Sequence, residues 1–291
     1  MTSYKMITND ESLWGSLYLP LQEKKTRNNA LRIVLFGSTN AGALVVDSLL
    51  RYERKYPDSL SLVAVATDDP ADPNTRISVN KRIWKYYNED EMLLLRNKVI
   101  DLSTRGGVPC YTGSIKTAYF REMLSEWSPD VILMCCFGQI VDPFIFEYPV
   151  YGMYNFHPSD LAANIGVGAQ PFQDTMKYGN STSMMTIHHV NELIDRGPVV
   201  GFSSKINIKK ADGQYPVSIL SLQEKIPSIS GWLGVELIRE VLRHKEEGVQ
   251  KPVERIDFAG RTPKHIQQKL LEPANDDLSD MYTLPLHDAL L

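Results

Sequence analysis

The sequence has little cysteine and no excess of positive charge, and both features narrow its class. Three cysteines occur in 291 residues, and Cys135 and Cys136 are adjacent within an apolar run. An odd number with an adjacent pair does not fit a disulfide framework, so we expect buried free thiols. The formal net charge is −4, whereas proteins that grip a nucleic-acid backbone usually carry a basic face. The charge balance therefore disfavours nucleic acid as a partner, although it does not exclude tRNA.

Long hydrophobic runs are also missing. No apolar run approaches the roughly 20 residues that span a bilayer, and the N-terminus from Met1 to Glu11 carries no signal-peptide pattern. We therefore expect a cytoplasmic protein with no membrane partner. Apolar residues still make up 43% of the chain, which is enough for a sizeable core.

Short apolar segments alternate with helical patterns along much of the chain. The predicted strands cover residues 31–36, 60–66, 130–136 and 151–156, and the predicted helices cover 43–52, 81–97 and 118–127. This alternation predicts an α/β fold, with a Rossmann-like, mostly parallel sheet and helices on both faces. Ligands bind such sheets at the carboxyl ends of the strands. Attention therefore falls on the turn at 37–42, on 137–141 and on the chain from Asn155 onward.

The two ends of the chain differ from this pattern. We expect an irregular N-terminal extension over 1–30, a main α/β domain over 31–205, and a small helical or mixed C-terminal region over 206–291. Residues 183–190 and 199–208 predict a hairpin, and 216–244 predict helix with breaks near Pro227 and Gly231. The apolar residues of that helix can pack on their own domain or form a homodimer contact, and the sequence leaves both open.

Three polar residues form the candidate catalytic group. Asn155 and His157 are two apart at the end of a predicted strand, so their side chains project from the same face, and Pro158 stops the strand. Asp195 follows an alternating segment and precedes the turn signal at Gly197. Each residue alone has an ordinary explanation, as a hydrogen-bonded structural histidine or a turn-capping aspartate.

Taken with their surroundings, these residues resemble the formyltetrahydrofolate-dependent formyltransferase family. That family includes the methionyl-tRNA, glycinamide-ribonucleotide and amino-sugar N-formyltransferases. Of these, the chain most resembles the sugar N-formyltransferases. The resemblance runs over roughly residues 31–202. The ordered matches are Phe137-Gly-Gln-Ile-Val-Asp-Pro143, Asn155-Phe-His-Pro-Ser159, Gly166 with Pro171, and Asp195-Arg-Gly-Pro198.

The resemblance implies an N-formyltransferase with Asn155, His157 and Asp195 as catalytic residues, 10-formyltetrahydrofolate as co-substrate and no metal. Asn155 would donate to the oxyanion of a tetrahedral intermediate, a contact worth about 3–4 kcal/mol in acyl transfer. His157 would move protons or stabilise the oxyanion, and Asp195 would favour the charged imidazole. The implied folate-binding residues are Phe137, Gly138, Gln139, Ile140, Val141, Val190, Asn191 and Glu192.

The loop after the strand departs from the family pattern. Ala162 stands where relatives usually have proline, and the spacing from Gly166 to Pro171 is longer. This loop helps to bind the amine in relatives, so Ser159, Gly166 and Gln170 are the candidate substrate-binding residues. The adjacent His188 and His189 should face opposite ways, one toward the site and one toward solvent, with no third ligand at metal spacing.

The sequence indicates the reaction more clearly than it indicates the amine that accepts the formyl group. We expect a nucleotide-linked amino sugar or a similar small amine, because the chain is acidic and its C-terminal part lacks the signature of a basic barrel. Methionyl-tRNA and glycinamide ribonucleotide are the alternatives within the family. A formyltetrahydrofolate deformylase, which uses water as the nucleophile, and a non-catalytic folate-binding module are the alternatives outside it.

Overall fold

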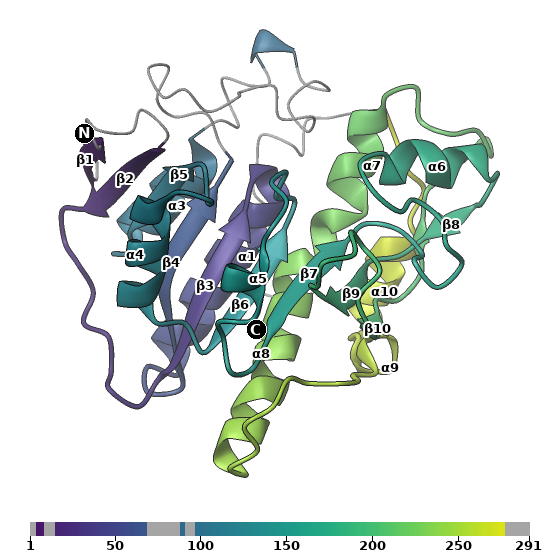
Figure 1. Ribbon diagram of the computed structural model, residues 1–291. Helices are drawn as coiled ribbons and strands as arrows, with labels where there is room; N and C mark the ends of the chain where they lie inside the picture. The colour runs from purple at the N-terminus through teal and green to yellow at the C-terminus, as the bar shows by residue number, and fades with distance from the viewer. Residues whose placement is uncertain (1–3, 9–14, 69–87, 91–96, 277–291) are drawn as a thin grey trace.

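The computed structural model describes residues 4–8, 15–68, 88–90 and 97–276 (Figure 1). Within these residues, nine strands form one sheet in the order β1-β2-β5-β4-β3-β6-β7-β9-β10. Its strands are β1 (Tyr4–Thr8), β2 (Gly15–Pro20), β3 (Leu31–Gly37), β4 (Leu60–Thr67), β5 (Cys110–Gly113), β6 (Val131–Cys135), β7 (Met153–His157), β9 (Thr186–His189) and β10 (Val199–Phe202).

The centre of the sheet is parallel and its two edges are antiparallel. Strands β5, β4, β3, β6 and β7 pair in parallel, and β2 on one side and β9 on the other run antiparallel to them. The central strands β3 and β4 are mostly apolar and, apart from Arg32, buried on both faces, as is typical of parallel strands covered by helices. The predicted α/β class with a mostly parallel sheet is therefore confirmed.

Helices cover both faces of the sheet. They are α1 (Thr39–Lys55), α3 (Lys98–Arg105), α4 (Ala118–Trp127), α5 (Pro143–Phe146), α6 (Pro171–Lys177), α7 (Ile219–Lys225), the 3-10 helix η2 (Pro227–Ile229), α8 (Ser230–Glu246), α9 (Phe258–Arg261) and α10 (Lys264–Leu271). Helices α1, α3 and α8 contribute to one hydrophobic cluster and α4 and α5 to another, with the sheet supplying side chains to both.

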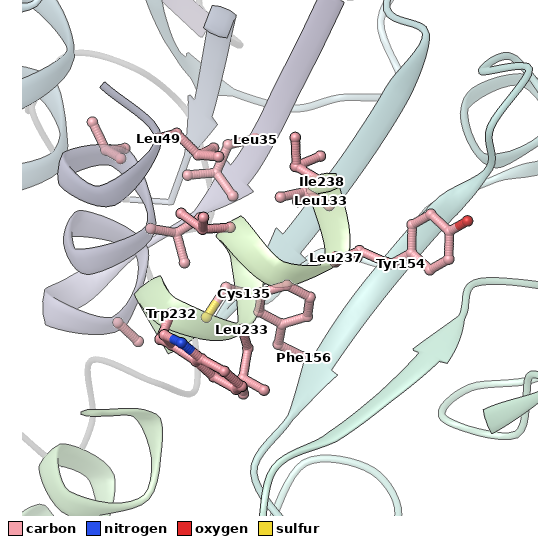
Figure 2. Packing of buried hydrophobic residues seen from close by; sticks show 14 of the residues in the cluster. Leu35, Leu49, Leu133, Cys135, Tyr154, Phe156, Trp232, Leu233, Leu237 and Ile238 are labelled. Atoms are coloured by element: carbon pink, nitrogen blue, oxygen red, sulfur yellow. The ribbon is translucent and has the colours of Figure 1, made fainter. Parts of the chain in front are cut away.

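Helix α8 lies directly on the main body of the fold. Figure 2 shows its Trp232, Leu233, Leu237 and Ile238 among buried side chains of β3, β6, β7 and α1. Gly231 allows the close approach of α8 to α1, because a Cβ there would lie 2.8 Å from the carbonyl oxygen of Leu44. The predicted break at Gly231 is therefore wrong, whereas the break at Pro227 coincides with η2.

The N-terminal residues are more regular than the sequence indicated. Strand β1 pairs with β2, and β2 pairs with β5, so both extend the sheet at one edge. The expectation of an irregular extension over 1–30 is wrong for these strands. The pairing of β2 with β5 joins residues far apart along the chain, and the local pattern of a short strand does not reveal such a partner.

Both halves of the predicted hairpin over 183–190 and 199–208 divide between two sheets. Strands β9 and β10 pair as expected, but β8 (Thr182–Ser183) and β11 (Ile206–Asn207) pair separately as a small two-stranded sheet. That small sheet joins residues on both sides of the expected boundary at 205. Buried residues of α8 and α10 also belong to the same cluster as those of β3 and β7, so the expected C-terminal region shares its core with the main domain.

The remaining differences concern helix boundaries. Helix α1 begins at Thr39 rather than at 43, so Gly42 lies in its first turn; a Cβ on Gly42 would lie 2.6 Å from the backbone carbonyl carbon of Gly37. Most of the predicted helix over 81–97 lies outside the described residues. Helix α3 and strand β5 were not anticipated. Across the described ranges, no helix is both long enough and apolar enough to cross a bilayer.

Candidate active site

The candidate site forms where β7 ends beside β9. Asn155 lies directly opposite His188 in the register of this antiparallel pair, and His157 lies opposite Thr186. All four side chains are buried. Since residues two apart on a strand share a face, Asn155 and His157 project together, as the sequence predicted.

Asp195 reaches this face from the loop between β9 and β10. Its backbone is left-handed, with φ +53°, a conformation that aspartate tolerates better than most residues. The N–H of Gly168 donates to its Oδ2 at 2.9 Å, which ties the loop after β7 to the loop after β9. The structure thus brings together all three predicted catalytic residues, which are separated by up to 40 positions.

Three nitrogen atoms surround the other carboxylate oxygen of Asp195. Its Oδ1 lies 3.3 Å from Asn155 Nδ2, 3.5 Å from His157 Nδ1 and 3.7 Å from His188 Nε2. Only the first is within hydrogen-bond distance, and all three exceed the length of a tight charge-assisted bond. This oxygen is therefore surrounded by potential partners without being firmly paired to any of them, whereas Oδ2 is held by Gly168.

His157 is held in a defined tautomer. Its Nε2 lies 2.6 Å from the carbonyl oxygen of Gly166, which can only accept, so Nε2 carries the hydrogen. Burial lowers the pKa of His157, and the charge of Asp195 and the Gly166 carbonyl offset this only in part. The neutral ring then presents the lone pair of Nδ1 beside Asp195, a suitable place to receive a proton.

Burial and partners act in opposite directions on Asp195. Burial raises the pKa of this carboxyl, but the neighbouring His188, the charge that His157 gains at low pH and the N–H of Gly168 together hold it below its ordinary value. Asp195 therefore stays ionised near neutral pH and stabilises an imidazolium when His157 gains a proton.

The predicted folate loop 137–141 is fixed by another aspartate, Asp68, which is fully buried. Asp68, at the end of β4, accepts from Gly138 N at 2.5 Å and from Gln139 Nε2 at 2.8 Å. Gln139 also donates to Gly113 O and accepts from Ile115 N, so it joins the ends of β4, β5 and β6. Asp68 was missed in the sequence, although it directly follows a buried apolar strand.

The other predicted folate residues lie on both sides of this loop. Phe137 and Val190 pack against the hydrophobic cluster that contains Val141. Ile140 is exposed over 61% of its surface. Asn191 accepts from the N–H of Leu193 and shapes the loop that leads to Asp195, and Glu192 follows it in that loop.

The three predicted substrate residues have different surroundings. Ser159 is fully buried, and its hydroxyl donates to Ile165 O at 2.9 Å, so it holds the loop after β7. Gly166 has φ +65°, and a Cβ there would lie 2.8 Å from Pro171 Cα. Gln170 is exposed at the start of α6. Direct contact of these residues with a substrate stays a prediction. The buried Ser159 holds the loop after β7 through its bond to Ile165.

The adjacent histidines differ from expectation in one respect. His188 faces the site, but His189 does not project into solvent: its ring lies 4.8 Å from that of Tyr154 and its Nε2 donates to Val253 O. Sequence reasoning did not assign His188 to the site, and the only signal was its alternation with His189. Within the described residues, no group of His, Cys, Asp and Glu side chains is arranged to hold a metal ion.

A family comparison accords with this geometry. The model of the formyl transferase family matches residues 32–218 of the chain, which include Asn155, His157 and Asp195. This chain belongs to the formyl transferase family. The resemblance drawn from the four motifs is therefore confirmed, and the match reaches past the expected boundary at 205.

Two similar curated proteins are both named methionyl-tRNA formyltransferases. A methionyl-tRNA formyltransferase of Ehrlichia ruminantium (strain Gardel) is 27% identical over 166 residues, 57% of this chain and 52% of the relative. One of Wolbachia pipientis is 30% identical over 51% of this chain and 45% of the relative. The chain thus spans about half the length of the curated relatives that it matches.

Solved structures show the same fold at low identity. A phosphoribosylglycinamide formyltransferase from Bacillus halodurans has a TM-score of 0.53 and 19% identity, covering 74% of this chain and 97% of that one. A formyltetrahydrofolate deformylase from Pseudomonas syringae has a TM-score of 0.54 and 16% identity, covering 79% and 67%. At these identities the likeness concerns the fold.

Proposed function

We propose that this protein transfers the formyl group of 10-formyltetrahydrofolate to a primary amine. The observation that carries the proposal is the meeting of buried Asn155 and His157 on β7 with the half-buried Asp195 of the β9–β10 loop, in a chain of the formyl transferase family. These residues supply an amide donor, a neutral imidazole with a free lone pair and an ionised carboxylate, which are the groups that acyl transfer to an amine needs.

The reaction proceeds through a tetrahedral intermediate. The amine nitrogen attacks the formyl carbon, a C–N bond forms, and the carbonyl electron pair moves to oxygen, where Asn155 donates a hydrogen bond. Nδ1 of His157 takes a proton from the attacking nitrogen, and Asp195, 3.5 Å away, stabilises the resulting imidazolium. Collapse breaks the bond to N10 of tetrahydrofolate, which receives that proton. The products are a formamide and tetrahydrofolate, with His157 neutral again.

The co-substrate site is proposed at the loops beside this group. Residues 137–141 and 190–192 would contact the pterin, because Phe137 and Val190 pack on the same hydrophobic cluster. Exposed Ile140 offers apolar surface, and the hydrogen bonds of Gln139 keep the 137–141 loop in shape. Ser159 and Gly166 hold the loop that would form one wall for the amine, with Gln170 at its exposed end.

Two acceptor classes compete. The acidic charge of the chain favours a small amine, and a nucleotide-linked amino sugar is our first candidate, although none of the similar proteins reported above is named for one. The names of the relatives favour methionyl-tRNA as the second candidate. A panel with 10-formyltetrahydrofolate and a nucleotide-linked amino sugar, glycinamide ribonucleotide or charged initiator tRNA separates them. Release of tetrahydrofolate without any amine would show hydrolysis instead.

The catalytic assignment has its own test. His157→Ala, Asn155→Ala and Asp195→Ala should each lower the formyl-transfer rate by at least about 100-fold, while circular dichroism and thermal unfolding show a folded protein. Near wild-type turnover in folded His157→Ala would overturn the assignment of the base. Activity on charged tRNA alone would overturn the small-amine candidate.

A further inference from the structure

His188 is a buried histidine in direct contact with the proposed catalytic group. It lies opposite Asn155 in the β7–β9 register and is only 2% exposed. Side chains directly opposite each other on antiparallel strands share a face. The family-derived roles of Asn155, His157 and Asp195 leave this histidine without a function.

The surroundings of His188 define its tautomer. Its Nδ1 lies 2.8 Å from the backbone carbonyl of His189, which can only accept, so Nδ1 carries the hydrogen. In the neutral ring, Nε2 then carries the lone pair, and it faces Asn155 Nδ2 at 3.1 Å. Asp195 Oδ1 lies farther from Nε2, at 3.7 Å. The hydrogen bond therefore runs from the Asn155 amide to His188.

This bond has a consequence for the amide of Asn155. Its nitrogen carries two hydrogens, and the structure offers them two acceptors, His188 Nε2 at 3.1 Å and Asp195 Oδ1 at 3.3 Å. Donation to the oxygen of a tetrahedral intermediate requires one of these contacts to yield. The contact with Asp195 is the longer, and that carboxylate keeps the N–H of Gly168 and gains the imidazolium of His157 as the reaction proceeds.

We propose that His188 is a positioning residue for formyl transfer to the amine, and this inference rests on that proposed function. As the Nδ1–H tautomer, it accepts one hydrogen of the Asn155 amide and fixes the plane of that amide. The second hydrogen stays on the Asn155 amide, and its hydrogen bond changes acceptor from Asp195 Oδ1 to the substrate oxygen. His188 thus acts through Asn155 and does not itself exchange a proton with the substrate.

Paired substitutions separate this role from simple packing. His188→Gln can place an amide oxygen near the position of Nε2 and accept from Asn155, whereas His188→Met fills similar space without an acceptor of comparable strength. We expect His188→Met to lower kcat about tenfold with the folate KM changed less than about threefold, and His188→Gln to retain kcat within about threefold. Equal losses in both variants, or wild-type kcat in His188→Met, would overturn the proposal.

The neighbouring histidine provides a matched control. His189→Gln changes the adjacent residue, whose ring packs on Tyr154 on the other face, and can keep a donor for Val253 O. Its kcat should stay within about twofold of wild type. A loss in His189→Gln as large as that in His188→Met would mean that the strand, and not the Asn155 contact, is being disturbed.

A spectroscopic measurement tests the same proposal without activity. Long-range 1H–15N spectra of 15N-histidine-labelled protein, assigned with His188→Gln, should show His188 with a protonated Nδ1 and an unprotonated Nε2 near neutral pH. In 15N-asparagine-labelled protein, the Nδ2 resonances of Asn155 should shift more in His188→Met than in His189→Gln. An Nε2–H tautomer overturns the proposal even if the enzyme is active. The expected spectra with no formyl transfer would sustain the contact and refute the proposed function.

Discussion

Two aspartates lie on loops that follow strands of the same sheet, Asp68 fully buried and Asp195 half-buried, and their hydrogen-bond partners differ. Asp68 accepts at 2.5 and 2.8 Å from donors on one short loop. Asp195 has one fixed donor, Gly168 N–H, and three nitrogen atoms at 3.3–3.7 Å around its other oxygen. Short bonds to fixed donors describe a carboxylate that holds structure, whereas loose contacts with a histidine and an amide describe one whose partners can exchange during a reaction.

The comparison is tested most strongly by Asp195→Asn. The amide fits the left-handed backbone, and one of its hydrogens can donate to Nδ1 of His157, which blocks the base and removes the charge that stabilises the imidazolium. We expect kcat to fall at least about 100-fold with only a small loss in melting temperature, because the charge of Asp195 stabilises the fold through its lowered pKa but makes one firm hydrogen bond, to Gly168. Single-turnover formyl transfer and thermal unfolding measure the two effects. Turnover within tenfold of wild type would contradict the distinction.

Asp68→Asn should lower stability and folate binding more than it lowers kcat, the opposite of what Asp195→Asn should do. The amide offers one acceptor where Gly138 N–H and Gln139 Nε2 need two, so one of these part-buried hydrogen bonds is lost at a cost of about 0.5–1.5 kcal/mol. Denaturant unfolding should show that loss, and the folate KM should rise more than kcat falls. A variant with wild-type stability but a kcat as low as that of Asp195→Asn would place Asp68 in the catalytic group instead.

The sequence could predict Asp195 but not Asp68 because only one belongs to a local pattern. Asn155 and His157 share a strand face through their spacing, and Gly197-Pro198 marks the turn after Asp195. Asp68 becomes meaningful only when β4 and β6 lie on either side of β3, which brings it to Gly138. The place of His188 in the site likewise depends on the β7–β9 register, which the sequence does not reveal. A shift of one residue would put His189 there instead.

The pH dependence of stability tests whether His157 is buried in its neutral form. Burial lowers the pKa of His157 below its ordinary value of 6.5. The unfolded chain therefore takes up the proton first as pH falls, and folding stability, complete above pH 6.5, declines below it. His157→Gln lacks this group, so its unfolding free energy should fall less between pH 7.5 and 5.5, a window chosen to bracket that value. Parallel curves for the two proteins would show that folding does not change the pKa of His157, and a smaller fall for the wild type than for the variant would show that folding raises it.

The low pKa of Asp195 also makes folding stability fall with falling pH, but over a lower pH range than the pKa of His157 does. Its partners hold the pKa below the ordinary value of 3.8, so its contribution to stability is complete above that value and is lost as pH falls further. The range above pH 5.5 therefore reports on His157 without interference from Asp195. Asp195→Asn, measured over the same range, is the control: it should remove the negative neighbour of His157 and lower that pKa further.

The smallest expected effect concerns the support behind Asp68. The Asp68 N–H donates to Ser38 Oγ at 2.8 Å, and this hydroxyl is fully buried. Ser38→Ala removes the acceptor and should cost about 0.5–1.5 kcal/mol of unfolding free energy. Ser125→Ala on exposed α4 is the matched control and should change stability by less than about 0.5 kcal/mol. If Asp68 holds structure, kcat in Ser38→Ala stays at the wild-type value while stability falls; a kcat loss without a stability loss would instead connect this end of the sheet to the chemistry at Asp195.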